Sequence, residues 1–75
     1  MTSRELLEKI KEEYENRGVW ISDIATDLHT SYENIRRIVV ALGFYRGRKI
    51  KDVNLDTLLY NNDIRSSLDK IVSSL

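Results

Sequence analysis

Cysteine and proline are absent from this chain of 75 residues, and glycine occurs only three times. Without cysteine there is no disulfide framework and no thiolate metal site, so nothing in the sequence points to secretion. The lack of proline and the scarcity of glycine favour helices joined by short turns. No run approaches the roughly 18 apolar residues that a membrane-spanning helix needs, and the N-terminus lacks the apolar stretch of a signal peptide. We therefore expect a cytoplasmic protein without a membrane partner.

The composition that remains is typical of a small folded domain. The chain is 41% hydrophobic and 32% charged, which is too apolar for a disordered segment. Its length allows one domain, here residues 1–75. Such a domain buries only about 60% of the surface of its unfolded chain and is marginally stable alone, and dimerisation is one common remedy.

The formal net charge is zero, but the charges are unevenly distributed along the sequence. Residues 34–51 hold six basic side chains and no acidic one, whereas residues 1–33 and 52–75 are both net acidic. Because a potential depends on the local distribution of charge, the basic segment can attract phosphate although the whole chain is neutral. The alternative is a chance clustering of charges on a solvated surface.

The N-terminal third predicts a helix followed by a short strand. Thr2 and Glu5 have the spacing of a capping box, and apolar residues at helical spacing follow them. We expect this helix over residues 3–17, with the next glycine ending it. Residues 19–21 form an apolar, β-prone run that predicts a strand, and its Trp20 is expected in the core.

Two further helices are predicted, separated by a tight turn. Ser22 can cap the first of them, which is expected to end near Leu28. The second is expected over residues 31–42, capped by Thr30 or Ser31 and ended by a glycine. Both helices carry apolar residues spaced i, i+3, i+4 and i+7, which predicts one buried stripe on each.

Residues 44–51 predict a β-hairpin around a central glycine. The sequence leaves two registers open. A two-residue loop at positions 47 and 48 would pair Tyr45 with Ile50, whereas a three-residue loop would pair Phe44 with Ile50. In either register several cationic side chains lie at or beside the tip.

Asn54 is expected to cap a last helical region that carries two apolar sets. The two sets fall on opposite sides of any continuous helix. Either the helix breaks in the polar residues 60–63, or one helix faces its own core first and a partner afterwards. Both versions leave a C-terminal apolar stripe uncovered, and we expect it to form a homodimer interface made of Ile64, Leu68, Ile71, Val72 and Leu75.

The order of these elements resembles a winged helix-turn-helix domain of the kind found in small prokaryotic, archaeal or viral transcription regulators. Residues 24–38 carry the resemblance. Ala25 supplies the small residue where two helices cross, Ser31 the hydroxyl cap, and Ile35 and Ile38 the branched apolar residues inside the recognition helix. The resemblance implies a mostly α fold with a small β-hairpin, the wing.

The turn between the two helices departs from the family pattern. His29 stands where glycine is usual, so it is expected to adopt a left-handed conformation, which histidine tolerates. Thr30 stands where an apolar residue is usual. The resemblance covers residues 2–59 as the core of the domain and leaves residues 60–75 as a C-terminal helix and possible dimerisation element.

The resemblance implies sequence-specific binding of double-stranded DNA by a homodimeric transcriptional regulator. The recognition helix would lie in the major groove, and the basic wing over residues 46–51 would lie on the backbone or in the minor groove. Arginine can bond guanine in a bidentate manner, which is worth about 1–3 kcal/mol of discrimination. The side chains expected at DNA are Thr30, Ser31, Tyr32, Glu33, Asn34, Arg36, Arg37, Arg46, Arg48, Lys49 and Lys51.

Each of these residues has a plainer alternative. The arginines can be solvated surface charges, and Tyr32 can pack against the wing. Glu33 fits a helix cap better than a reader of bases. Asn34 suits adenine or a phosphate equally well.

Other classes of function are weaker matches to the sequence. A winged helix can also be a protein interaction module that binds no nucleic acid, since a fold does not dictate function. RNA binding ranks third because no aromatic platform for stacked bases is evident. An enzyme is not expected, because the chain has no cysteine nucleophile, no second histidine and no glycine-rich phosphate loop. The single histidine, His29, predicts no metal site, and no cofactor is expected.

Overall fold

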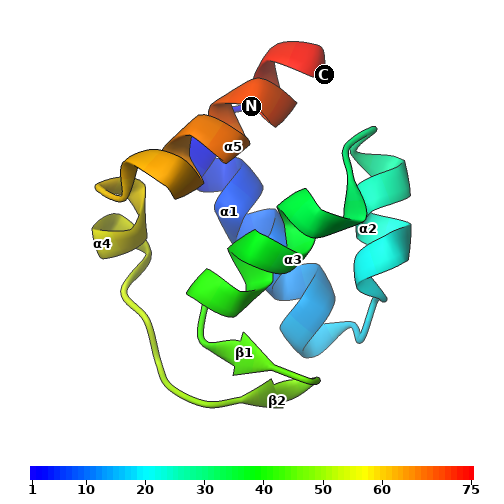
Figure 1. The fold of residues 1–75 in the computed structure, drawn as a ribbon, viewed down its shortest axis with the longest axis vertical. Helices are drawn as coiled ribbons and strands as arrows, with labels where there is room; N and C mark the ends of the chain where they lie inside the picture. Colours follow the sequence, from blue (N-terminus) through cyan, green and yellow to red (C-terminus); the bar gives the residue numbers. More distant parts are fainter.

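Five α-helices surround one apolar core in the computed structural model, which describes residues 1–75, and a two-stranded antiparallel sheet lies beside them (Figure 1). A mostly helical fold with a small hairpin was expected, and this is confirmed. None of the helices is both long and apolar enough to span a membrane. The elements are α1 (Ser3–Lys11), α2 (Ile21–Asp27), α3 (Tyr32–Ala41), β1 (Phe44–Tyr45), β2 (Arg48–Lys49), α4 (Leu55–Leu59) and α5 (Asn62–Ser74).

The first helix begins as its sequence predicts. The Oγ1 atom of Thr2 accepts a hydrogen bond from the Glu5 backbone N–H at 3.1 Å, and the Glu5 carboxylate accepts one from the Thr2 backbone N–H at 3.0 Å. This bond to the backbone N–H lowers the pKa of Glu5 below its ordinary range. After α1 the chain continues as a π-helical turn over Glu12–Asn16, so the helical region matches the expected residues 3–17 to within one residue.

The strand expected over residues 19–21 is not formed. The two strands of the sheet pair only with each other, so this apolar run has no strand to bond with. Instead, Ile21 begins α2, and the residue before it, Trp20, lies outside the core with 75% of its surface exposed. The prediction of a buried Trp20 is therefore wrong, and Ser22 lies in the first turn of α2 and is not its cap.

The turn between α2 and α3 follows the sequence closely. His29 has a φ of 54°, so the left-handed conformation expected there is confirmed. Ser31 is the N-cap of α3, and its Oγ accepts a hydrogen bond from the Asn34 backbone N–H at 3.1 Å. Ser31 thus takes the capping role that was left open between it and Thr30.

Both registers expected for the hairpin are wrong. Phe44 pairs with Lys49 and Tyr45 pairs with Arg48, which leaves positions 46 and 47 as a two-residue loop. The φ angles at these positions are 51° and 78°. A loop with positive φ at both central residues has the twist that matches two antiparallel strands, and here an arginine accepts that conformation at the first position.

The C-terminal region contains a break, as one of the two expected versions required. The helix α4 begins with Asn54 as its cap and ends at Leu59. Asn61 then caps α5, because its side-chain oxygen accepts hydrogen bonds from the backbone N–H groups of Asp63 at 3.0 Å and Ile64 at 3.2 Å. Two asparagine caps within eight residues thus divide the C-terminal region into α4 and α5.

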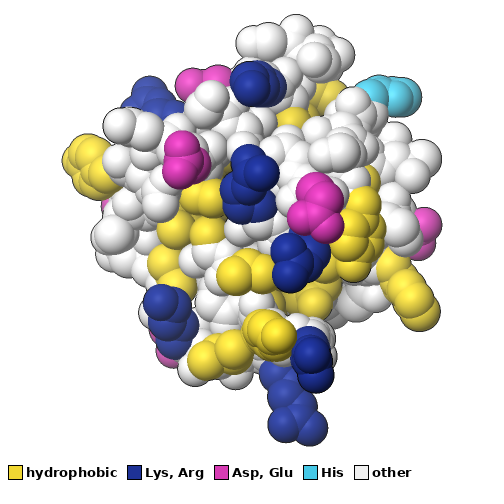
Figure 2. Space-filling model, in the orientation of Figure 1, with side chains coloured by type: hydrophobic (Ala, Val, Ile, Leu, Met, Phe, Trp, Pro, Cys, Tyr) yellow, Lys and Arg dark blue, Asp and Glu magenta, His cyan; other side chains and the backbone are white.

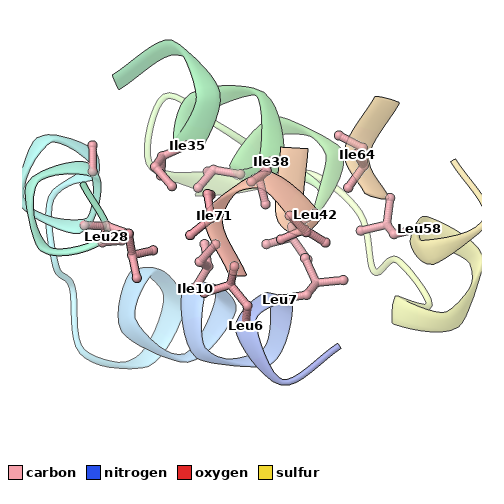
Figure 3. Close-up of a cluster of buried hydrophobic side chains, with 14 of the residues drawn as sticks. Leu6, Leu7, Ile10, Leu28, Ile35, Ile38, Leu42, Leu58, Ile64 and Ile71 are labelled. Atoms are coloured by element: carbon pink, nitrogen blue, oxygen red, sulfur yellow. The ribbon is translucent and has the colours of Figure 1, made fainter. Parts of the chain in front are cut away.

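The break lets α5 return over the apolar stripes of α1 and α3 (Figures 1 and 3). As a result Ile64, Leu68 and Ile71 are at most 3% exposed and belong to the chain's own core. The expectation of an uncovered dimer stripe is therefore wrong for these three residues. Val72 also packs against the core, and only Leu75 is largely exposed. A homodimer remains a prediction without an assigned surface.

The rest of the core comes from the predicted apolar stripes. Figure 3 shows Leu6 and Ile10 of α1 directed toward Ile38 of α3 and toward Leu42, the C-cap of that helix. These four side chains are at most 1% exposed. Since α1 and α3 direct their apolar stripes into the shared core from opposite sides (Figure 3), their polar faces point away from each other.

Candidate nucleic-acid interface

One face of the molecule combines α3, the hairpin and the C-terminal half of α5. Figure 2 shows Lys and Arg side chains over each of these elements, with hydrophobic side chains between them. The three elements also line shared grooves: one lies between α3 and α5, and the other lies between α3, the hairpin and the start of α2.

The arginines of α3 lie on its exposed side, as the helical spacing predicts. Ile35 and Ile38 are buried, whereas Arg36 and Arg37 are exposed. Arg36 contacts Glu33 at 3.6 Å between Nη1 and Oε2, so Glu33 serves this ion pair and forms no capping box. Arg37 has no ion pair and is free to bind an anion.

The start of α3 presents two hydroxyl groups, each of which already accepts one hydrogen bond. The Asn34 backbone N–H donates to Ser31 Oγ at 3.1 Å, and its side-chain amide donates to Thr30 Oγ1 at 3.0 Å. Each hydroxyl can still donate its own proton, for example to a phosphate oxygen. The same bonds hold the partly buried Asn34 side chain against the turn, which favours a structural role over reading of adenine.

The C-terminal helix adds a basic residue that sequence reasoning missed. Lys70 of α5 lines a polar groove together with Arg37, Thr30 and Ser31. It forms no ion pair, and the side chain is exposed. The signal was present in the sequence, because Lys70 lies on the polar side of the α5 apolar stripe, but the assignment of this region to a dimer interface hid it.

The hairpin carries the remaining basic side chains, and they differ in availability. Arg48 and Lys51 are exposed and have no ion pair. The Arg46 guanidinium lies over the ring of Tyr45, with its Cζ atom 5.3 Å from the ring centre, which is a cation–π contact.

Lys49 is already neutralised within the chain. Its Nζ atom lies 2.6 Å from a carboxylate oxygen of Asp52 and 3.1 Å from one of Glu15. These two carboxylates, Asp52 first, raise the pKa of Lys49 above its ordinary value. The pKa of Glu15 is lowered in turn, first by Lys11 and then by Lys49. The contact with a DNA phosphate expected of Lys49 would require breaking these pairs.

Aromatic side chains lie on the same face, which sequence reasoning did not anticipate. Trp20, Tyr32 and Tyr45 are 75%, 50% and 47% exposed. Trp20 and Tyr32 line the groove that also contains the hairpin tip. Tyr32 is half exposed and lines this groove beside Arg46 and Gly47 of the hairpin tip. The absence of an aromatic platform, which ranked RNA third, does not hold.

The structure offers no alternative site for metal chemistry. No group of three or more His, Cys, Asp or Glu side chains is placed to hold a metal ion.

Comparisons with protein-family models, with curated proteins and with solved structures found no match to this chain. The function has to be argued from the exposed face alone.

Proposed function

We propose that this chain is a winged helix-turn-helix protein that binds double-stranded DNA in a sequence-specific manner and regulates transcription. In this proposal α3 is the recognition helix in the major groove, and the β1–β2 hairpin is the wing on the backbone or in the minor groove. The observation that carries the proposal is a set of exposed basic side chains without ion pairs, which α3, the hairpin and α5 contribute to one face: Arg37, Arg46, Arg48, Lys51 and Lys70.

The distribution of the acidic side chains supports the same assignment. On α3, Glu33 is the only acid, and it is paired with Arg36. In the first helical region, Glu8, Glu13 and Glu15 each form an ion pair with a base four residues earlier in the chain. Most of the exposed bases without an ion pair therefore lie at the face that contains α3, where they can attract the phosphate backbone although the whole chain is neutral.

The two ends of α3 offer different contacts. At its start, the hydroxyls of Thr30 and Ser31 with Arg37 and Lys70 suit a backbone phosphate, which fixes the position of the helix. Farther along, Arg36 lies beside the groove that leads to the hairpin, where a guanine edge in the major groove could replace Glu33 as its partner.

The test is fluorescence anisotropy of labelled duplex DNA of random sequence at about 50 to 200 mM salt. The variant Arg36→Gln/Arg37→Gln removes two positive charges from α3. The matched control Arg4→Gln/Lys9→Gln removes two from α1, on the other side of the core (Figure 3). Selection of a preferred sequence from a random library would follow.

We expect steep salt dependence for the wild type and the control. Each lost phosphate contact should reduce the slope of log affinity against log salt by about 0.9. The α3 variant should therefore bind more weakly with a shallower slope. Equal binding by the two variants, or no binding of duplex DNA at low salt, would overturn the proposal and favour the protein interaction module.

A further inference from the structure

A groove with aromatic walls lies between the start of α2, α3 and the hairpin tip. Trp20 and Tyr32 line it, and Tyr14 packs edge-on against Phe44 at its base, with the two ring centres 5.2 Å apart. The part of the groove that Trp20 and Tyr32 line has a volume of about 560 Å³, within the range of small-ligand pockets, roughly 300–1,000 Å³. The two exposed rings are outside the core, so they are available to a binding partner.

The charged groups of this groove select the chemistry of its occupant. Arg46 and, in the middle of α3, Arg36 are the only charged side chains that line it. No carboxylate does so. An occupant must therefore offer flat apolar surfaces for the rings and negative charge for the arginines, and a nucleotide has both, in its base and its phosphate.

We infer that this groove binds single-stranded DNA, with unpaired bases stacked on Trp20 and Tyr32 and a phosphate held by Arg46. Duplex DNA cannot satisfy the groove, because its base faces are hidden in the stack and only unpaired bases offer them. The inference rests on the proposed function in one respect, since the groove borders the face assigned to DNA. In this inference the same face binds single-stranded DNA in addition to duplex DNA.

Trp20 is the only tryptophan and therefore reports directly on the groove. We would titrate the wild-type protein with a twelve-residue oligothymidylate, which forms no duplex, and follow the intrinsic fluorescence. Stacking of a base on the indole ring should quench it. Anisotropy of the labelled oligothymidylate would give the affinities of variants that lack the reporter.

Trp20→Ala and Tyr32→Ala should each weaken binding of the oligothymidylate by roughly 5- to 150-fold, the range for losing one stacked base. Neither change should unfold the protein. Trp20 is 75% exposed and its side chain does not cap α2, and Tyr32 is half exposed. Far-UV circular dichroism would check this. The matched control is Tyr60→Ala, an aromatic side chain 84% exposed at the end of α4, which should leave the affinity unchanged.

Absence of quenching, or equal affinities for the Trp20→Ala variant and the Tyr60→Ala control, would overturn the inference. Its failure is distinguishable from failure of the proposed function, because duplex binding depends on Arg36 and Arg37 and is measured separately. Duplex binding without binding of the oligothymidylate refutes only the single-strand site. The opposite result refutes only the duplex proposal.

Discussion

Gly43 joins α3 to the hairpin, and its replacement by alanine should be far more costly than that of the glycine at the hairpin tip. The φ of Gly43 is 99°, and a Cβ atom added there would overlap the backbone carbonyl oxygen of Lys51. The carbonyl of Gly43 also accepts hydrogen bonds from the backbone N–H groups of Ile50 at 2.6 Å and Lys51 at 3.3 Å. The overlap can be relieved only if the strand leaving the hairpin moves away, which breaks these bonds.

The magnitude follows from two contributions. A side chain in a left-handed conformation costs roughly 1–2 kcal/mol. Loss of two backbone hydrogen bonds adds about 0.5–1.5 kcal/mol each. The variant Gly43→Ala should therefore lower the free energy of unfolding by about 2–5 kcal/mol. That is a large part of the ~4–11 kcal/mol expected for a domain of this length.

The control is Gly47→Ala. Gly47 also has a positive φ, 78°, but an added Cβ would have no atom within 4 Å, so only the conformational cost of roughly 1–2 kcal/mol applies. Urea denaturation followed by far-UV circular dichroism gives both free energies of unfolding. If the two variants lost equal stability, the steric part of this reasoning would be refuted.

Three further predictions concern the core, the first helix and the turn. Leu68 is buried, so Leu68→Ala should lower the free energy of unfolding by about 2–5 kcal/mol. Leu75 is largely exposed, so Leu75→Ala should change it by less than about 0.5 kcal/mol. Equal losses of stability in thermal denaturation would contradict the burial of α5. The hydrogen bond from the Thr2 backbone N–H lowers the pKa of the Glu5 carboxyl group. The stability that this bond contributes is therefore present above the pKa of the unfolded carboxyl group and is lost as pH falls through the folded pKa. Stability measured by denaturation should therefore decline below about pH 4.5, less so in Glu5→Gln, and identical pH profiles would count against the capping box. The variant His29→Gly should raise the free energy of unfolding by about 0.5–1 kcal/mol, because glycine adopts a φ of 54° without steric cost. A lower free energy of unfolding in this variant would argue against strain in the turn.

Local features were the most predictable part of this fold. The capping box at Thr2, the left-handed His29 and the cap at Ser31 each depend on a few neighbouring residues. Helical spacing also identified the buried and exposed sides of α3 correctly. These features could be predicted because the interactions that stabilise them lie within one helical turn of the sequence.

Most of the errors concern groups whose partners lie far away in the chain, whereas the error in the hairpin register is local. Trp20 is hydrophobic, but no strand or helix packs over it. The hairpin register depended on which residue would accept a positive φ, and here Arg46 does so. Lys49 counted as a free cation until the fold brought Glu15 beside it, 34 positions away in the sequence.

The sequence by itself determined where the first helical region and α3 begin and end, which sides of the helices are apolar, and that one segment holds an excess of basic residues. Only the tertiary structure decided what those sides meet. Folding buried the α5 stripe against α1 and α3, placed Lys70 beside the start of α3, and left Trp20 and Tyr32 exposed around one groove. The physical reason is that periodicity shows that a stripe will be buried, whereas the covering surface depends on the packing of all the helices together.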